Sequence, residues 1–457
     1  MTLQEYIQAN YDGSPSWFRD ECMKTWHVNR VHDILDTKEY LAGKHRILTR
    51  NNENWNGKAY ETRKIILQLP KTLCNFETSF LLKNPVTLVC EEQDTLKALK
   101  DVYKRARYDN IDFKLLDKMV KYGEIYEYVY VDDKEKITSR IIPGEDSYPV
   151  FDDRGKMICF VEYYVIEGVS YYTVYEESKV KTYTDDGGDL RQIGEYDNLS
   201  GLPIQYKTMN EMDSERGRSD IDDYVGIVDS LEDLISKYTD ALHKYISGIP
   251  VLTGEKLKIG KQGEGQVDPN AVGFVLQIEQ GSEFGIVQNK MDSNSFKALY
   301  DKLLNNLLLA AQCPSIALNQ QELSNISETS IKMTYSLATI KAKQNSECLL
   351  DGFEQRWDKI MKLLELQGVK VEGDVDCTFE FDIPENSAQI IEDIDNLREH
   401  GLISKETALS RIPYVYDVQS EMEKIKAEEK EKGKETENKD KDKEKGTGKG
   451  KEKETEM

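Results

Sequence analysis

Hydrophobic and polar positions between residues 219 and 366 predict three helices around a small β-rich insert. Over 221–245, apolar side chains recur every three or four positions, which is typical of a helix with one buried face. Gly248 and Pro250 follow this run and are expected to end the helix. The opposite face is mainly acidic and carries Asp229, Glu232, Asp233 and Asp240.

The rest of this stretch predicts, in order, the β-rich insert, a second helix, a polar loop and a third helix. Short apolar runs separated by glycines over 250–291 predict strands that are too few to bury a core of their own. A second helix is expected over 292–312, where Pro314 stops it, and a third over 328–366.

The third predicted helix is long. Forty residues would form a rod of roughly 60 Å, and Gly352 lies where a bend is expected. We expect such a rod to span domains or to pack against other subunits.

The residues before and after this stretch predict a mixed α/β body and a small helical appendix. A helical pattern over 60–82 contains Pro70, which should break or kink it. Tyrosine-rich alternating runs predict an antiparallel meander between 125 and 184. Residues 375–383 predict one strand, which should pair with the upstream β region. Short helices are expected over 387–400 and 404–411.

Net charge argues against a surface that binds nucleic acid tightly, and the cysteines indicate the redox compartment. The net charge is −23, and residues 421–457 account for −1 of it, which leaves −22 on the body. Tight, sequence-independent binding to nucleic acid relies on Lys and Arg, so a body this acidic argues against a binding surface but not against a surface that nucleic acid slides past. Seven scattered cysteines without CxxC spacing predict free thiols in a reducing compartment.

Motifs for catalysis, metal binding and membrane insertion are not found. The sequence contains no HExxH, no GxSxG, no phosphate-binding loop after a strand, no secretory signal and no apolar run of membrane-spanning length. We therefore expect no catalytic residue, metal or cofactor, and no membrane association.

Five segments in order resemble a known family. They are YLAGKHRILTR at 40–50, the segment 71–87 ending in LLKNPVT, GEIYEY at 123–128, RGRSD at 216–220 and ETALSRIPYVYD at 406–417. The ordered set resembles the portal proteins of tailed double-stranded-DNA bacteriophages, in the siphophage branch, and covers about residues 30–425. Residues 201–210 match this pattern poorly, and the charged tail has no counterpart in it.

The resemblance implies an α+β portal fold with an α/β wing, a helical stem, a small β-containing clip, a long kinked helix and a C-terminal helical crown. The implied boundaries are a wing at 1–218, a stem helix at 219–249, a clip at 250–291, a second stem helix at 292–313, a tunnel loop at 314–327, the long helix with its returning strand at 328–384 and a crown at 385–425. The charged tail at 426–457 is expected to be disordered from its composition, because it has almost no apolar residues.

It also implies a function and a set of partners. The chain would form a homo-oligomeric ring, a dodecamer, at one capsid vertex of the virion, after synthesis in the host cytoplasm. The ring would be the head-tail connector through which double-stranded DNA enters during packaging and leaves during genome ejection. The terminase large subunit, head-completion or adaptor proteins, and capsid and scaffolding proteins would bind it.

The implied site residues fall into three groups. The tunnel loop would present Asn319, Gln320, Gln321, Glu322 and Asn325 to DNA, and the clip would dock partners through Glu255, Lys256, Lys258, Lys261, Glu264 and Asp268. Asp229, Glu232, Asp233 and Asp240 either line a channel that repels phosphates or form salt bridges between subunits.

Two other functions remain open from the sequence. One is a different ring-forming structural protein of the virion, such as a head-tail adaptor. The other is a DNA-processing enzyme, for which the residues give no support.

Overall fold

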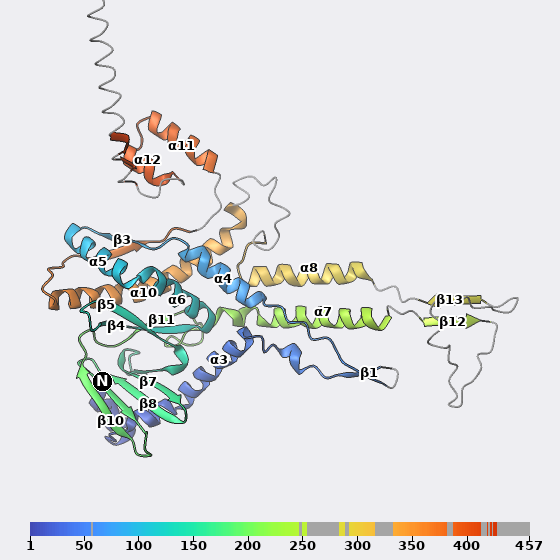
Figure 1. The fold of residues 1–457 in the computed structure, drawn as a ribbon, viewed down its shortest axis with the longest axis horizontal. Coiled ribbons are helices and arrows are strands. Elements are labelled where there is room, and N and C mark those ends of the chain that lie inside the picture. Colours follow the sequence, from blue (N-terminus) through green and yellow to red (C-terminus); the bar gives the residue numbers. More distant parts are fainter. Residues whose placement is uncertain are drawn as a thin grey trace, which may run out of the picture. The chain divides into compact units, whose positions relative to one another are not determined.

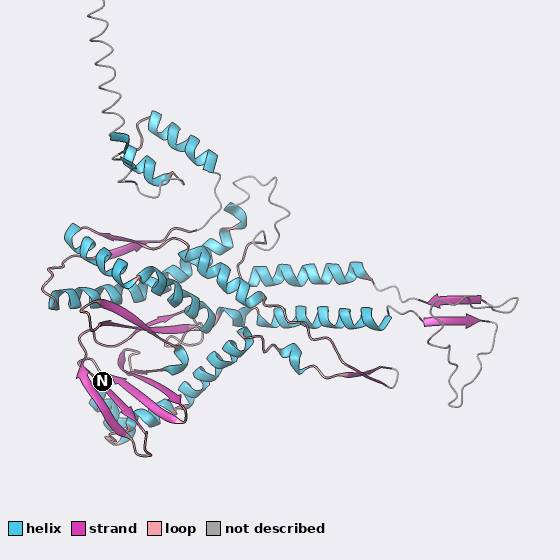
Figure 2. Ribbon diagram, viewed as in Figure 1, coloured by secondary structure: helices cyan, strands magenta, loops and turns pink. Residues whose placement is uncertain are grey.

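The computed structural model describes residues 1–55, 58–245, 249–253, 283–287, 292–315, 332–381, 387–412, 418, 421–422 and 424–426. The chain divides into two compact units: residues 1–324 with 333–382, and residues 325–332 with 383–457. Helices and sheets both build the larger unit (Figures 1 and 2), which confirms the predicted α+β class.

A five-stranded antiparallel sheet and three N-terminal helices form one core of the larger unit. The sheet has the order β10-β9-β8-β7-β6. The meander predicted over 125–184 is therefore divided: its strands from residue 147 onward lie in this sheet, while its first two, over 124–142, belong to a second sheet. Trp17, Phe18 and Cys22 pack on its face against Tyr148 and Tyr172. The elements are α1 (Leu3–Tyr11), α2 (Trp17–Cys22), α3 (Thr25–Leu41), β6 (Ser147–Phe151), β7 (Met157–Ile166), β8 (Val169–Tyr175), β9 (Lys179–Thr184) and β10 (Arg191–Asp197).

The tyrosines of this sheet are structural. Tyr163 on β7 stacks on Tyr172 of β8 with ring centroids 4.6 Å apart, and Tyr164 stacks on Tyr171 at 5.5 Å. Both pairs are directly opposed across the two strands, where aromatic pairs stabilise a sheet.

Glu21 on α2 is a buried carboxylate that ties the N-terminal helices together. It accepts hydrogen bonds from the hydroxyls of Tyr6 (2.8 Å) and Tyr11 (2.5 Å), and it pairs with Lys24 at 3.0 Å. Burial alone would raise its pKa, but hydrogen bonds from His27 and both tyrosines, with the charge of Lys24, outweigh burial and lower the pKa to about 2.

We expect Glu21 to make the protein sensitive to acid. Because its pKa in the folded chain lies below the ordinary value of 4.5, the ionised carboxylate stabilises the fold above pH 4.5. This contribution, of up to about 3 kcal/mol, is lost as the pH falls from 4.5 towards 2. In thermal unfolding at pH 3 and pH 6, Glu21→Gln should show a smaller difference between the two pH values than the parent chain. The exposed Glu39→Gln should keep the parent difference, and an unchanged difference in Glu21→Gln would contradict this role.

A second sheet and four helices form the centre of the larger unit. The sheet has the order β11-β4-β5, and helix α10 lies against β11 and β4. Its elements are β4 (Glu124–Val131), β5 (Ile137–Ile142) and β11 (Ile204–Lys207), and the helices are α4 (Leu69–Leu82), α5 (Gln93–Ala106), α6 (Tyr108–Tyr122) and α10 (Ser336–Leu366).

Pro70 decides where α4 begins. The helical pattern was expected to start at residue 60, but residues 61–68 form no helix, and α4 begins at Leu69 with the proline in its first turn. Proline is tolerated there because the first helical N–H groups have no partner within the helix. The preceding residues are thereby free to run extended beside another helix.

Helix α10 is buried by its own chain. Leu349, Phe353, Trp357, Ile360 and Leu363 are all at most 2% exposed. The rod was expected to span domains or to pack against other subunits, and for most of its length the second alternative is not needed, because the body of the same chain covers its apolar face.

The break in the long helix is at Tyr335 and not at Gly352. A helical segment at 332–334 precedes Tyr335, and α10 begins at Ser336. Gly352 lies within an unbroken helix and serves a close approach: a Cβ there would lie 2.1 Å from a ring carbon of Tyr206 on β11. The expected bend at this glycine was wrong.

Arg356 on α10 is the cation at the centre of this core. Its Nε lies 2.9 Å from Oε2 of Glu127 on β4, and its Nη1 lies 2.5 Å from Oδ1 of Asp112 on α6. Tyr206 donates its hydroxyl to Glu127 at 2.6 Å. Burial raises the pKa of Asp112 to about 6 against the opposing charge of Arg356. One guanidinium therefore joins α6, α10 and the sheet.

The returning strand pairs with the early body, as predicted. β14 (Val375–Thr378) is antiparallel to β3 (Thr87–Cys90), with Val375 opposite Cys90 and Thr378 opposite Thr87. This pairing joins parts of the chain that are almost 290 residues apart.

The two predicted stem helices lie side by side (Figure 1). A 3-10 turn, η3 (Asp220–Asp223), precedes α7 (Val225–Tyr245), and α8 (Ser293–Ala310) returns beside it, with the Tyr238 and Phe296 rings stacked at 3.8 Å. Between them in the sequence, β12 (Ile249–Thr253) pairs antiparallel with β13 (Glu283–Val287). Two of the apolar runs predicted to be strands are confirmed, and the third, at 274–276, lies outside the described residues.

The smaller unit contains α11 (Ser387–Glu399) and α12 (Lys405–Arg411), close to the two helices that the sequence predicts. The charged tail from 427 onward lies outside the described residues. None of the helices described in either unit has an apolar stretch of the length needed to cross a membrane.

Candidate functional site

Three side-chain oxygens on α7 form a line that binds an extended segment of the N-terminal region. Glu232, Ser236 and Asp240 recur every four residues and lie on one face of the helix. Their oxygens accept hydrogen bonds from the backbone N–H groups of Leu67 (2.7 Å), Ile65 (3.0 Å) and Arg63 (2.9 Å), respectively. We call this arrangement the oxygen ladder.

The repeat lengths of helix and extended chain explain the match. Four residues of α-helix rise about 6 Å, and two residues of extended chain span about 6.6 Å. Every second N–H of the segment therefore meets the next acceptor on α7. The segment needs no neighbouring strand to satisfy these N–H groups.

Glu232 is fully buried at the base of the ladder. Its Oε1 lies 2.6 Å from Nδ1 of His45, whose ring stacks on Tyr40 at a centroid distance of 3.9 Å. Burial raises the pKa of Glu232, although the Leu67 N–H and His45 act in the opposite direction. At the other end, Asp240 also accepts the Tyr60 hydroxyl at 3.1 Å and pairs with Arg50 at 2.8 Å.

These positions change the interpretation of the four acidic residues. Glu232 is 0% exposed and Asp240 is 2% exposed. Both were expected on a surface facing a channel or a neighbouring subunit, but the structure places them inside this chain, where backbone N–H groups need acceptors. Asp229 and Asp233 are partly exposed: Asp229 accepts the Tyr40 hydroxyl at 3.1 Å, and Asp233 pairs with Lys237 at 2.7 Å. For these two, both expected roles stay predictions.

We expect Asp240→Ala to release the segment from α7 without unfolding the body. The change removes the acceptor of the Arg63 N–H, the Tyr60 hydroxyl and the Arg50 guanidinium. Amide hydrogen exchange at residues 61–67 should accelerate roughly 10- to 100-fold, while exchange in α10 stays unchanged. Asp301→Ala, at an exposed carboxylate of α8, should leave both regions unchanged. Slow exchange at 61–67 in Asp240→Ala would show that the ladder does not hold this segment.

The other predicted site residues are outside the described parts of the chain. This applies to the tunnel-loop residues Asn319, Gln320, Gln321, Glu322 and Asn325 and to the clip residues Glu255, Lys256, Lys258, Lys261, Glu264 and Asp268. The described residues nearest to them in sequence are β12, β13, the end of α8 and the start of the helix at 332.

A buried charge cluster lies where α4, η3 and α10 meet. Lys341 lies 2.9 Å from Asp220 and 3.9 Å from Glu77, and Asn345 donates to Glu77 at 2.7 Å. Burial, followed by the charge of Asp220, raises the pKa of Glu77 well above its ordinary value. No local pattern in the sequence predicts this cluster, because its members come from three distant segments. The spacing of apolar residues along those helices does not indicate that their charged side chains would meet.

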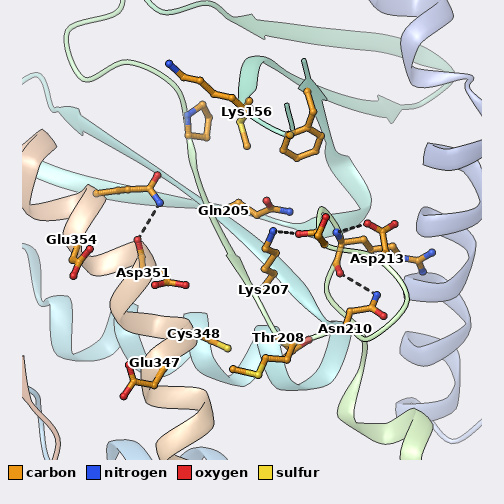
Figure 3. Close-up of a pocket in the computed structure, with 18 of the residues that line it drawn as sticks. Lys156, Gln205, Lys207, Thr208, Asn210, Asp213, Glu347, Cys348, Asp351 and Glu354 are labelled. Atoms are coloured by element: carbon orange, nitrogen blue, oxygen red, sulfur yellow. Dashed lines mark hydrogen bonds between the residues drawn. The ribbon is translucent and has the colours of Figure 1, made fainter. Parts of the chain in front are cut away.

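The pocket of Figure 3 is an open groove of about 990 Å³ between α10 and the loop after β11. Glu347, Asp351 and Glu354 project from α10 along one side, while Lys207 donates to the backbone of Ser214 on the other. Burial raises the pKa of the lining thiol of Cys348, so this cysteine is a poor nucleophile. The described residues also contain no group of three or more His, Cys, Asp or Glu side chains arranged to hold a metal ion. This groove presents mixed charge and no arrangement typical of catalysis.

The helices α7 and α8 pair beside a mixed helix and sheet body, and β12 pairs with β13 between them in the sequence. The chain belongs to the phage portal proteins. The family model that matches is described as phage portal protein, SPP1 Gp6-like, and it covers residues 23–435.

Solved structures give distant likenesses. The neck of an empty gene transfer agent particle, computed with C6 symmetry, matches with a TM-score of 0.48 and 12% identity over 75% of this chain and 88% of that chain. The virion of a native gene transfer agent particle matches with a TM-score of 0.45 and 12% identity over 74% and 87% of the two chains. The family assignment does not rest on these likenesses. No curated protein sequence matches the chain significantly.

Proposed function

We propose that this chain assembles into a closed ring that forms the portal of a phage-like particle and encloses a channel for double-stranded DNA. The observation that carries the proposal is the family match over residues 23–435, which includes the body, both stem helices and the hairpin. The acidic body supports a surface that DNA passes without strong binding, because few unpaired cations would be available to neutralise phosphates.

Partner docking is assigned to the clip. We propose that residues 250–291 bind the terminase large subunit during packaging and head-completion or adaptor proteins afterwards, while the wing and crown contact capsid and scaffolding proteins. The two described strands of this segment, β12 and β13, provide a fixed base for the residues between them. The tunnel loop at 314–327 is proposed to face DNA.

The ring is tested first, by electron microscopy and native mass measurement of the purified full chain. Uniform rings with a central hole are expected. A compact monomer that persists at high protein concentration would overturn the proposal. A ring that binds no terminase but joins tail components would instead favour a head-tail adaptor.

Clip docking is tested by replacing residues 255–281 with a short Gly-Ser linker between β12 and β13. We expect rings to form as before, and terminase binding and DNA packaging to fall to background. The control is an equal Gly-Ser replacement in the charged tail at 430–456, which should leave terminase binding unchanged. Normal terminase binding after the clip replacement would refute this assignment.

A further inference from the structure

A groove beside α7 is lined by small residues, Gly226 and Ser230, on the helix and by Arg46, Ile47 and Arg50 on the opposite side. The groove has a volume of about 410 Å³ and lies between α7 and the 3-10 turn η1 (Arg46–Thr49). A Cβ added at Gly226 would meet no atom within 4 Å, and Ser230 turns its hydroxyl onto the carbonyl of Gly226 at 2.8 Å. The backbone of α7 is therefore open to close approach by another helix. Asp229 and Asp233 line the same groove.

The outward face of α8 has complementary features. Leu307 and Leu308 are buried, but Leu309 is 63% exposed and Leu299 is 49% exposed. Lys302 is exposed, and its helical spacing from Phe296, whose ring stacks on Tyr238 of α7, places it on the side of α8 away from α7. It forms no ion pair with any residue that the structure describes. An exposed leucine and an unpaired lysine thus project from the same helix face.

The stacked rings of Tyr238 and Phe296 fix the heights of these residues along the two antiparallel helices. Measured along each helix axis from the stacked rings towards the body, Asp233 lies about 7.5 Å along α7 and Lys302 about 9 Å along α8. Gly226 lies about 18 Å and Leu309 about 20 Å from the same level. The lysine is therefore level with the carboxylate, and the leucine is level with the glycine.

We propose that the outward face of α8 packs into the α7 groove of a second copy of this chain, with Leu309 against Gly226 and Lys302 beside Asp233 and Asp229. The inference rests on the proposed ring. Copies in a closed ring are related by rotation alone, so residues at equal height meet when the helix pair stands along the ring axis. Of the two roles open for Asp229 and Asp233, this assigns contact between subunits in place of channel lining.

A disulfide cross-link tests the register directly. All seven native cysteines are buried, so mild oxidation of Gly226→Cys/Leu309→Cys should link only the new pair. We expect a ladder of covalent multimers on a non-reducing gel, whereas each single variant should stay monomeric on that gel. Matched double variants with Leu299→Cys in place of Leu309→Cys should not cross-link, because this leucine lies about 13 Å from the glycine in height. Intact rings without a Gly226–Leu309 cross-link would overturn the register.

Charge reversal tests the polar contact. Lys302→Glu alone and Asp233→Lys alone should each reduce the ring fraction about tenfold or more, because like charges then meet at every contact around the ring. The combined variant should restore rings, and Lys297→Glu on the flank of α8 should leave them unchanged. Failure of the combined variant to restore assembly would overturn the pairing. Failure of the parent chain to form rings would instead refute the proposed function, so the two outcomes are distinguishable.

Discussion

Replacing Arg356 with methionine is expected to lower the free energy of unfolding by about 3 to 5 kcal/mol. The guanidinium is completely buried between Glu127 at 2.9 Å and Asp112 at 2.5 Å. Methionine fills a similar volume but leaves two carboxylates without a counter-charge in a site that water does not reach. Chemical denaturation, followed by the fluorescence of the adjacent Trp357, measures the change.

Two comparisons separate charge from packing. Arg191→Met removes an exposed arginine whose pair with Asp186 spans 3.4 Å, and it should change stability by less than about 0.5 kcal/mol. Arg356→Met combined with Asp112→Asn and Glu127→Gln removes the stranded charges and should be more stable than Arg356→Met alone. A loss of less than about 1 kcal/mol in the single variant would contradict the structure, because it would mean that the carboxylates are solvated.

Gly352→Ala is expected to destabilise the chain by about 3 kcal/mol or more. Helix propensity alone would predict a gain of about 1 kcal/mol, since alanine replaces glycine within a helix. The packing effect dominates because the new methyl carbon would lie 2.1 Å from Cε1 of Tyr206. That ring is fully buried and its hydroxyl is bound to Glu127, so it has no room to move aside. The thermal unfolding temperature should fall accordingly.

The sign of this change decides between two explanations of the glycine. Glu354→Ala, on the exposed side of the same helix, serves as the control and should stay within about 0.5 kcal/mol of the parent chain. Gly352→Ala combined with Tyr206→Leu should recover part of the loss, since the smaller side chain makes room. An increase in stability for Gly352→Ala would mean that the glycine serves flexibility and not close packing.

Elements with strong local patterns could be predicted from the sequence. The apolar steps of α7 and α8, the alternation in β4 and β7, and the pairing of the 375–378 strand with the early body are all confirmed. Local sequence suffices for the helices, because each buries one face whatever its partner is. β4 was recognised by its β-forming residues, although the structure buries both of its faces over 124–129. The wing, stem, clip and crown boundaries stay predictions.

The errors arose where a distant partner decides the structure. Glu232 and Asp240 have the pattern of solvent-facing acids, and their acceptor role depends on a segment about 170 residues earlier in the chain. The four-residue spacing of Glu232, Ser236 and Asp240 was a readable signal, since it aligns three oxygens on one helix face. Gly352 gave no such signal: glycine in a helix is consistent with a bend or with close packing, and only the position of Tyr206 distinguishes them.

The oxygen ladder has a mechanical consequence. Its three hydrogen bonds follow one another along α7 and link it to one segment that runs beside the helix. A thrust along that axis loads all three in shear, so they must rupture together, whereas peeling the segment from one end breaks them in succession. The N-terminal segment therefore braces the helix most firmly against force directed along its length.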